Sequence, residues 1–399
     1  MSGPTTEAPA PLVVPPDGLP ADAFTPVHPR YGSGSLADLL PAALAVLGVP
    51  GTVDVLGLAE PLAGVRRIAV LLVDGLGAYQ LPLVAPHAPA LAALAADRTL
   101  TSGFPSTTPV SLVTLGTGTP PGRHGILGFT VGAPGGGVLN LIRWRDEPDP
   151  AAWQPVPTRF EQAAAAGLAV IAVTRPEFAG SGLTVAANRG AAFSGAADLD
   201  ATAEGMLAAL RAADGPALVY GYHPDLDHAG HVAGVGSDAW QAAAAGVGRL
   251  LGRLLDGLPP DTALLVTADH GQFNVPPEGR FDIAADPDLA AGVDLVAGEP
   301  RVRYLHVADG AVDDVVAAWR GVLGGAARVA TRAEAVDGGW FGPVAAAHLG
   351  RIGDVVVTCL DRHVVLAGDH EPPAVGRLIG YHGSLTAAEM TVPLLVARA

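Results

Sequence analysis

The chain has 399 residues, of which 49% are hydrophobic and 16% are charged, so it can bury one large core or two ordinary ones. Its formal net charge of −16 argues against a surface that coats nucleic acid, because such surfaces are basic. Cys359 is the only cysteine, which excludes an intrachain disulfide and a thiolate zinc cluster. The sequence has neither an apolar run of membrane-spanning length nor a signal-peptide pattern at its N-terminus, so we predict a cytoplasmic protein without a membrane segment.

The elements expected along the chain alternate between strands and helices. Residues 1–30 are rich in proline and aperiodic, which predicts a flexible arm. A helix is expected over 34–49, interrupted or bent near Pro41. Strands are then expected at 66–74, 168–174, 217–222 and 263–269, with helices at 159–167, 200–214 and 238–258. This alternation predicts an α/β fold with a mostly parallel sheet and helices on both faces.

One later segment differs from this alternation. Residues 297–342 have the pattern of a strand, a helix, a second strand and a second helix, after which the chain returns to short strands at 354–360 and 363–368. We therefore predict that 297–342 forms a small α+β cap subdomain. The cap interrupts a main domain that consists of 31–296 and 343–399.

Three of the expected strands end in acidic or histidine side chains. Asp74 ends the first, Asp227 and His231 follow the third, and Asp269 and His270 end the fourth. The carboxyl ends of parallel strands meet at one edge of a sheet, so these side chains should converge although they are far apart in sequence. Asp and neutral His are ligands for zinc and similar divalent cations, and a mixed set without Cys is typical of a catalytic site.

The spacing within "DHAGH" and one remote histidine add to this predicted site. Asp227 and His231 are four residues apart, so one helical turn would bring both to one ion, and Gly230 permits a close approach. Asp225 is the alternative to Asp227, but it lacks this spacing. His382, in "IGYHGSLT", is a plausible remote ligand.

A hydroxyl-rich turn supplies the candidate nucleophile. Residues 102–128 begin with "SGFPSTTP" and run into an apolar, helix-like stretch. A helix N-terminus suits a phosphate, and a hydroxyl close to a metal ion can be activated as a nucleophile. Ser106, Thr107 and Thr108 all meet this description.

The motifs together resemble a known family. "LLVDGLG", "FPSTTP" leading into "GRHGI", "DHAGH", "TADHG" and "YHGSLT" occur in one order over roughly residues 66–396. They resemble the nucleotide pyrophosphatase/phosphodiesterase branch of the alkaline phosphatase superfamily. The resemblance implies an alkaline-phosphatase-like three-layer α/β sandwich. It also implies two divalent cations, Zn²⁺ first with Mn²⁺ as the alternative, and a phospho-threonine intermediate.

Position by position, the resemblance assigns roles to residues of this chain. The implied ligands of one ion are Asp74, Thr108, Asp269 and His270, and those of the other are Asp227, His231 and His382. The family's Pro-x-x-Thr pattern, counted from Pro105, selects Thr108 as the nucleophile, with Thr107 as the fallback. Ser111 stands where many members have an Asn that contacts a phosphate oxygen, so it is the predicted substrate-binding residue.

The implied activity is hydrolysis of a phosphodiester or pyrophosphate bond in a small phosphorylated substrate such as a nucleotide. A phosphomonoesterase or a phosphonate C–P hydrolase would use the same site. A metal-loaded binding protein without turnover is the alternative from another class. Selection of the leaving group is expected in 297–342 and in the loop 139–153, whose Arg143 and Arg145 face either substrate or solvent. The sequence leaves the oligomeric state open.

Overall fold

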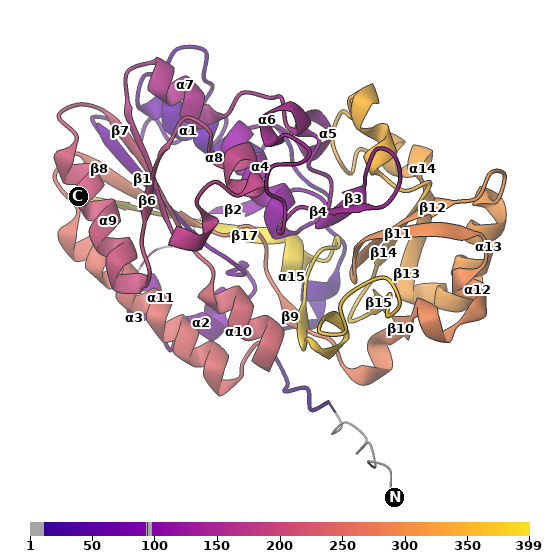
Figure 1. The fold of residues 1–399 in the computed structure, drawn as a ribbon. Coiled ribbons are helices and arrows are strands. Elements are labelled where there is room, and N and C mark those ends of the chain that lie inside the picture. Colours follow the sequence, from indigo (N-terminus) through magenta and orange to yellow (C-terminus); the bar gives the residue numbers. More distant parts are fainter. Residues whose placement is uncertain (1–11, 93, 95–97) are drawn as a thin grey trace, which may run out of the picture.

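The computed structural model describes residues 12–92, 94 and 98–399, and its largest element is a seven-stranded sheet (Figure 1). The strand order is β2-β17-β8-β1-β7-β5-β6. In that order the strands are Arg98–Thr101, Thr391–Arg398, Thr262–Thr267, Arg67–Val73, Ala217–His223, Ala169–Thr174 and Ala192–Gly195. The five strands from β8 to β6 run parallel, whereas β17 is antiparallel to both of its neighbours. The predicted mostly parallel sheet is therefore confirmed.

The four strands predicted from apolar runs are the four innermost parallel strands of this sheet. In β1, β7 and β8 nearly every residue is buried, because helices cover both faces. The register aligns Val73 with His223, and Leu72 with Thr267. The polar residues that follow these three strands therefore start from the same edge of the sheet.

Helices lie in two layers, one on each face of the sheet (Figure 1). One layer contains α9 (Leu199–Ala212), α10 (Asp225–Ala233) and α11 (Asp238–Gly257). The other contains α1 (Leu39–Val46), α4 (Thr108–Thr117), α7 (Arg159–Ala165) and α8 (Gly182–Asn188). The bend expected at Pro41 is not needed, because α1 begins only at Leu39 and a proline is tolerated in the first turn of a helix. These layers and the sheet form the predicted three-layer sandwich.

A second, antiparallel sheet forms a separate part of the molecule (Figure 1). Its strands are β11 (Val293–Glu299), β12 (Val302–Val307), β14 (Val355–Cys359) and β13 (Ala327–Thr331), in that order. Helices α13 (Val312–Leu323) and α14 (Arg332–Asp337) accompany it. This sheet extends beyond the predicted cap of 297–342 at both ends. The apolar pattern of 354–360 indicates a strand but not its sheet, and β14 in fact pairs between β12 and β13.

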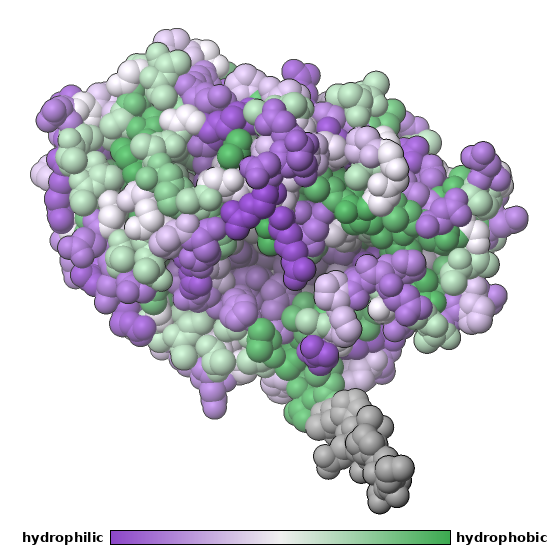
Figure 2. Space-filling model, viewed as in Figure 1, coloured by the Kyte–Doolittle hydropathy of each residue, from purple (hydrophilic) through white to green (hydrophobic). Residues whose placement is uncertain are grey.

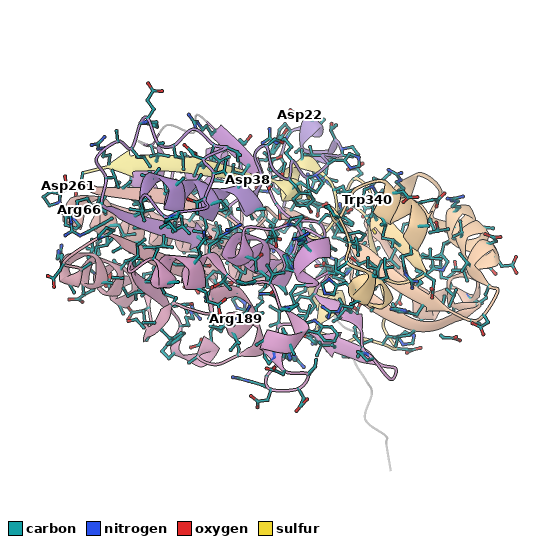
Figure 3. The ribbon with its side chains drawn as sticks, turned by 90° about the horizontal axis from the view of Figure 1, so that it is seen from above. Asp22, Asp38, Arg66, Arg189, Asp261 and Trp340 are labelled. Carbon is teal, nitrogen blue, oxygen red and sulfur yellow. The ribbon has the colours of Figure 1, made fainter. Side chains whose placement is uncertain are left out.

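Two contacts fix the small sheet against the rest of the molecule. Trp340 lies between the two parts (Figure 3), where its ring meets that of Phe104 edge-on at 5.5 Å. Arg301, in the β11–β12 turn, forms a fully buried ion pair with Glu389 of α15 (Ala387–Met390) at 2.7 Å. Because Phe104 lies shortly before Thr108 in the chain, the small sheet also supports the loop that carries the candidate nucleophile.

The described part of the predicted arm is attached to the body, and residues 1–11 lie outside the described residues. Asp17 is buried, forms an ion pair with Arg362 and accepts a hydrogen bond from the backbone N–H of Asn274 at 3.0 Å. Pro26 bridges to Thr386. The proline-rich composition predicted a flexible arm, but these specific polar contacts hold residues 12–30 against the body. Within the described ranges, no helix has both the length and the apolar composition that crossing a membrane requires.

Candidate active site

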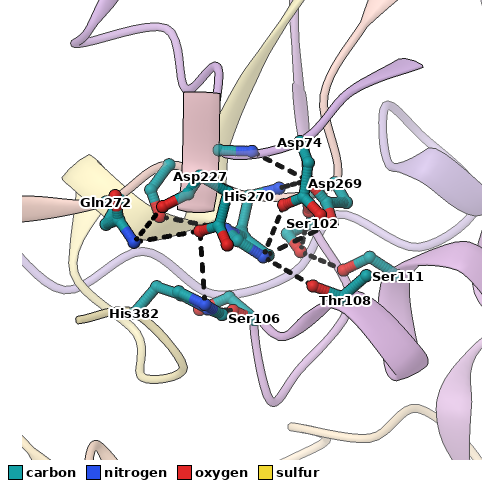
Figure 4. A network of polar contacts seen from close by, with 12 residues as sticks. Asp74, Ser102, Ser106, Thr108, Ser111, Asp227, Asp269, His270, Gln272 and His382 are labelled. Carbon is teal, nitrogen blue, oxygen red and sulfur yellow. Dashed lines mark hydrogen bonds and ion pairs between the residues drawn. The ribbon is translucent and has the colours of Figure 1, made fainter. Parts of the chain in front are cut away.

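The polar residues predicted at the strand ends converge at one edge of the large sheet (Figure 4). Asp74 follows β1, Asp269 and His270 follow β8, and α10 after β7 carries Asp227 and His231. His382 arrives from the C-terminal part of the chain, directly after the short strand β16 (Gly380–Tyr381). Seven residues were predicted as metal ligands, and the structure brings all of them, including Thr108, to this place.

Asp74, Asp269 and His270 form the first ligand group. The Nε2 atom of His270 lies 3.4 Å from Asp74 Oδ1 and 3.4 Å from Asp269 Oδ2. Thr108 Oγ1 lies 3.2 Å from the same nitrogen. An ion with tetrahedral bonds of about 2.0 Å separates its ligand atoms by about 3.3 Å, so these spacings match those around a bound zinc-sized cation. Asp74 Oδ1 and Asp269 Oδ2 are buried and lack a hydrogen-bond donor among the described residues, as oxygens reserved for a cation would.

Asp227, His231 and His382 form the second ligand group. The Nε2 atom of His231 lies 3.3 Å from Asp227 Oδ2 and 3.2 Å from His382 Nε2. His382 Nε2 is 3.7 Å from Asp227 Oδ1. The spacing of four residues on α10 therefore brings Asp227 and His231 together as predicted.

The orientation of the three imidazoles is fixed by backbone carbonyls. The Nδ1 atoms of His231, His382 and His270 contact the carbonyl oxygens of Gly380, Ser106 and Gly271 at 2.8, 2.9 and 3.2 Å. A carbonyl only accepts, so each Nδ1 carries the proton and each Nε2 offers a bare lone pair in the neutral ring. The Nε2 lone pairs of His231 and His382 therefore face each other at 3.2 Å, an arrangement that a cation between them stabilises.

Burial raises the pKa values of the two carboxyl groups in the first ligand group and lowers the pKa of its imidazole. Burial, followed by the nearby carboxylates of Asp269 and Asp227, raises the pKa of Asp74 well above its ordinary value. Burial raises the pKa of Asp269 to about 6 and lowers that of His270 to about 4. Burial thus favours the neutral imidazole, which is the form that binds metals. It also leaves the two carboxylates without enough nearby positive charge to stabilise their ionised forms.

A second layer of contacts holds the carboxylates in place. The Tyr222 hydroxyl donates to Asp74, and the amide of Gln272 donates to Asp227 Oδ1 at 2.9 Å. Gly230 makes room for Gln272, because a Cβ there would lie 1.7 Å from the Gln272 side-chain oxygen. Tyr222 and Gln272 were not predicted as site residues, although both stand close to the quoted motifs: Tyr222 lies five residues before "DHAGH", and Gln272 directly follows "TADHG". Partners of this kind orient ligands and raise metal affinity.

The structure separates the three hydroxyls that the sequence left open. Thr108 is the first residue of α4, and its hydroxyl faces His270. The Ser106 hydroxyl donates to the carbonyl of Ser384 at 2.7 Å. Thr107 is the buried residue before the helix, and its hydroxyl has no hydrogen-bond partner among the described residues. Geometry therefore favours Thr108 over both neighbours.

Two other residues weighed in the sequence do not join the candidate ligand groups. Ser111 is fully buried and pairs with the hydroxyl of Ser102 at 2.8 Å, so the structure places its hydroxyl inside α4 packing and not on a cavity wall. A role for Ser111 in substrate binding remains a prediction without support from this geometry. Asp225 instead forms an ion pair with Arg175, and Asp227 is the carboxylate of this helix that lies with His231 and His382.

Two cavities meet at the ligand groups, on a face that is hollowed between the two sheets (Figure 2). The larger has a volume of about 620 Å³ and is lined by Asp74, Thr108 and Asp227 together with aromatic side chains. The smaller has a volume of about 330 Å³ and extends toward β11 and β12 of the small sheet. Both cavities include His231, His382 and Phe129 in their walls. The ligand groups therefore lie at the junction of two lobes.

Glu299 is a wall residue of the smaller cavity that the sequence did not reveal. It ends β11, is 6% exposed, and its Oε1 has no hydrogen-bond partner among the described residues. Burial, reinforced by the nearby Glu389, raises the pKa of Glu299 to about 8, although the Thr107 hydroxyl, Arg303 and Arg301 act in the opposite direction. The sequence around Glu299, "AGEPRVR", does not indicate that the side chain is buried, because the burial arises when the loop after His382 packs against β11.

We expect Glu299→Gln to change the pH dependence of stability. Between about pH 4.5 and 8 the folded protein retains the Glu299 proton that the unfolded chain loses, so wild-type stability falls as the pH rises through this range. Glutamine has no such proton. The free energy of unfolding of the variant, relative to that of the wild type, should therefore increase by roughly a few kcal/mol from pH 5 to pH 8. Urea unfolding of both metal-free proteins, followed by tryptophan fluorescence, measures this difference. Parallel pH profiles would contradict it.

Comparison with known proteins places the chain in a family. The model of the type I phosphodiesterase/nucleotide pyrophosphatase family matches residues 68–385, which is most of the chain and includes all seven predicted ligands. The chain belongs to this family. It is thus a metal-dependent hydrolase of the phosphodiesterase and nucleotide pyrophosphatase type, as its motifs predicted. A search among curated proteins found no match.

Solved structures share the fold of this phosphodiesterase-family chain. Murine ectonucleotide pyrophosphatase/phosphodiesterase 5 is 18% identical, with a TM-score of 0.67 over 84% of this chain and 88% of that one. An inactive variant of the murine protein was solved in complex with AMP, at a TM-score of 0.66 and 17% identity over 83% and 87% of the two chains. Phosphonoacetate hydrolase from Sinorhizobium meliloti, in complex with phosphonoacetate, is 22% identical, with a TM-score of 0.63 over 84% and 90%. These likenesses support the alkaline-phosphatase-like fold.

Proposed function

We propose that this hydrolase cleaves phosphodiester or pyrophosphate bonds with two divalent cations and with Thr108 as the nucleophile. The observation that carries the proposal is the position of the Thr108 hydroxyl, 3.2 Å from His270 Nε2 and on the wall of the cavity that also exposes Asp74 and Asp227. A hydroxyl beside the first ligand group, on a cavity wall that also includes residues of the second, is well placed for attack on a phosphorus atom held by both. A cytoplasmic location remains a prediction from the sequence.

The two ligand groups fit two cations. One cation would be held by Asp74, Asp269, His270 and the Thr108 oxygen. The other would be held by Asp227, His231 and His382. Two divalent cations, Zn²⁺ or alternatively Mn²⁺, would supply four positive charges against three carboxylates, polarise the phosphoryl group and lower the pKa of the Thr108 hydroxyl. This local charge explains how a protein of net charge −16 binds an anionic substrate.

The chain's own residues define a two-step reaction. Thr108 begins α4, so its oxygen and the positive end of the helix dipole face the same cavity. The Thr108 oxygen bonds to phosphorus while the bond to the leaving oxygen on the opposite side breaks, and the hydroxyl proton passes through solvent to the leaving oxygen. This step gives phospho-threonine and the released alcohol or phosphate. A water molecule then attacks the same phosphorus, which restores the Thr108 hydroxyl and releases a phosphate monoester.

The larger cavity suits the part of a nucleotide that stays on the phosphorus. The rings of Phe178 and Tyr222 meet edge-on with centroids 6.0 Å apart, and both line this cavity with Phe129. Aromatic walls favour a flat base by stacking. The AMP complex of the murine relative supports a nucleotide as the substrate.

Turnover of two chromogenic substrates tests this function. The metal-loaded protein should hydrolyse bis-p-nitrophenyl phosphate with a higher kcat/KM than p-nitrophenyl phosphate. Two lobes that diverge from the ligand groups accommodate two substituents on one phosphorus, which a monoester lacks. Preference for the monoester would identify a phosphomonoesterase with the same ligands. Turnover of neither substrate, with two ions bound, would leave a phosphonate hydrolase or a metal-loaded binding protein.

A further inference from the structure

The smaller cavity lies on the side of the site away from Thr108. Its wall contains His231 and His382 of the second ligand group, whereas Asp74 of the first group and Thr108 line only the larger cavity. In an in-line displacement the leaving group departs opposite the attacking oxygen. A group that leaves from phosphorus, opposite Thr108, therefore passes the second ligand group and enters the smaller cavity, which we call the leaving-group lobe.

One arginine of the leaving-group lobe is free to bind a ligand. Arg143 is exposed and lines the lobe, and its guanidinium has no hydrogen bond or ion pair among the described residues. Its backbone is held firmly, because the N–H groups of Ile142 and Arg143 each donate to Asn140 Oδ1 at 3.0 Å. Arg145, two residues later, is also exposed but lines the larger cavity. The loop thus places one guanidinium at each lobe.

The other ionisable groups of the leaving-group lobe do not cancel this charge. Arg303 and Glu371 neutralise each other through two hydrogen bonds of 2.8 and 2.9 Å. The Glu299 carboxyl is buried against the loop after His382, since a Cβ on Gly383 would lie 2.8 Å from its carboxyl carbon. Burial raises the pKa of this carboxyl to about 8, so near pH 7 it adds little negative charge to the lobe. His370 adds a further polar side chain.

We infer that Arg143 is the specificity-determining residue of the leaving-group lobe, where it distinguishes a leaving group that carries negative charge from an uncharged one. This inference rests on the proposed function. A guanidinium binds phosphate oxygens with charge-assisted, often paired hydrogen bonds, whereas an aryl leaving group offers it no such acceptors.

Two thymidine substrates with the same retained group isolate this effect. Thymidine 5′-diphosphate releases phosphate, and the p-nitrophenyl ester of thymidine 5′-monophosphate releases p-nitrophenol. In Arg143→Ala, the ratio of kcat/KM for the diphosphate to that for the ester should fall about 10- to 100-fold, the loss of a hydrogen bond to a charged group. Arg143→Lys should restore part of this ratio, because the charge returns without the fork of donors.

Arg145→Ala is the matched control, since it removes the same charge from the same loop but at the other lobe. It should change kcat/KM for both substrates alike, and so leave their ratio within about threefold of the wild type, a change of less than about 0.7 kcal/mol. An unchanged ratio in Arg143→Ala, or an equal fall in both variants, would overturn the inference while the proposed function stands.

Turnover of neither substrate by the wild type would instead count against the proposed function. The lobe is then tested by calorimetric titration of the metal-loaded protein with inorganic pyrophosphate. Weaker binding to Arg143→Ala than to Arg145→Ala, by about 10-fold or more, would support the lobe as an anion site. Equal binding to both variants would overturn it.

Discussion

Thr108→Ala is expected to reduce kcat/KM for bis-p-nitrophenyl phosphate by at least about 10³-fold, because removal of a nucleophile abolishes the covalent route and leaves only the contribution of binding and electrostatics. The fold should persist, since α4 begins with Thr108 followed by a proline and does not depend on the Thr108 side chain for capping. Circular dichroism and metal analysis, run beside the kinetics, verify that the loss is chemical.

Thr107→Ala is the matched control for this substitution. The Thr107 hydroxyl is buried next to the Glu299 carboxyl, whose pKa it lowers, and makes no hydrogen bond to a candidate metal ligand among the described residues, so its loss leaves both ligand groups in place. We expect activity within about a factor of three of the wild type. If Thr107→Ala were the inactive variant and Thr108→Ala active, the nucleophile would be Thr107 and the assignment from the Pro-x-x-Thr pattern would be wrong.

Asp227→Asn is expected to empty the second ligand group. Asparagine keeps the size of the side chain but removes the charge that a divalent cation requires, and affinity should fall by more than about 100-fold, since even residues that only orient ligands contribute 10- to 100-fold. Dialysed protein should then contain one equivalent of metal instead of two by mass spectrometry. Diester turnover should fall in parallel, because the leaving group loses the cation opposite Thr108.

Asp225→Asn provides the comparison, two residues away on the same helix. Asp225 is partly exposed and pairs with Arg175, so its substitution should leave the metal content at two and cost no more than a surface ion pair does. Loss of metal from Asp225→Asn but not from Asp227→Asn would show that Asp225, and not Asp227, is the metal ligand.

The main fold and the convergence of the candidate ligands were predictable because both rest on local patterns with a physical cause. Strands buried on both faces give continuous apolar runs, such as "IAVLLV", and parallel strands must bring their carboxyl ends to one edge. Asp74 and the Asp269–His270 pair were visible for this reason. The spacing of Asp227 and His231 needed only one helical turn.

The features that escaped prediction depend on contacts between distant segments. The apolar pattern of β14 does not indicate which sheet the strand joins, so the predicted cap of 297–342 does not include it. Ser111 faces Ser102 because of how α4 packs, and a family pattern for position 111 carries no information about that packing. The two lobes, and the burial of Glu299 beside the loop of His382, arise only when the small sheet docks on the large one.

The most direct test of the two-metal, Thr108-dependent reaction is the trapping of the covalent intermediate. The metal-loaded protein is mixed with bis-p-nitrophenyl phosphate, quenched in acid within the first turnover, digested and analysed by mass spectrometry. We predict an aryl phosphate adduct on the peptide that contains Thr108, located on that side chain and absent from Thr108→Ala. A rapid release of p-nitrophenol without any adduct, or an adduct on another residue, would contradict the account.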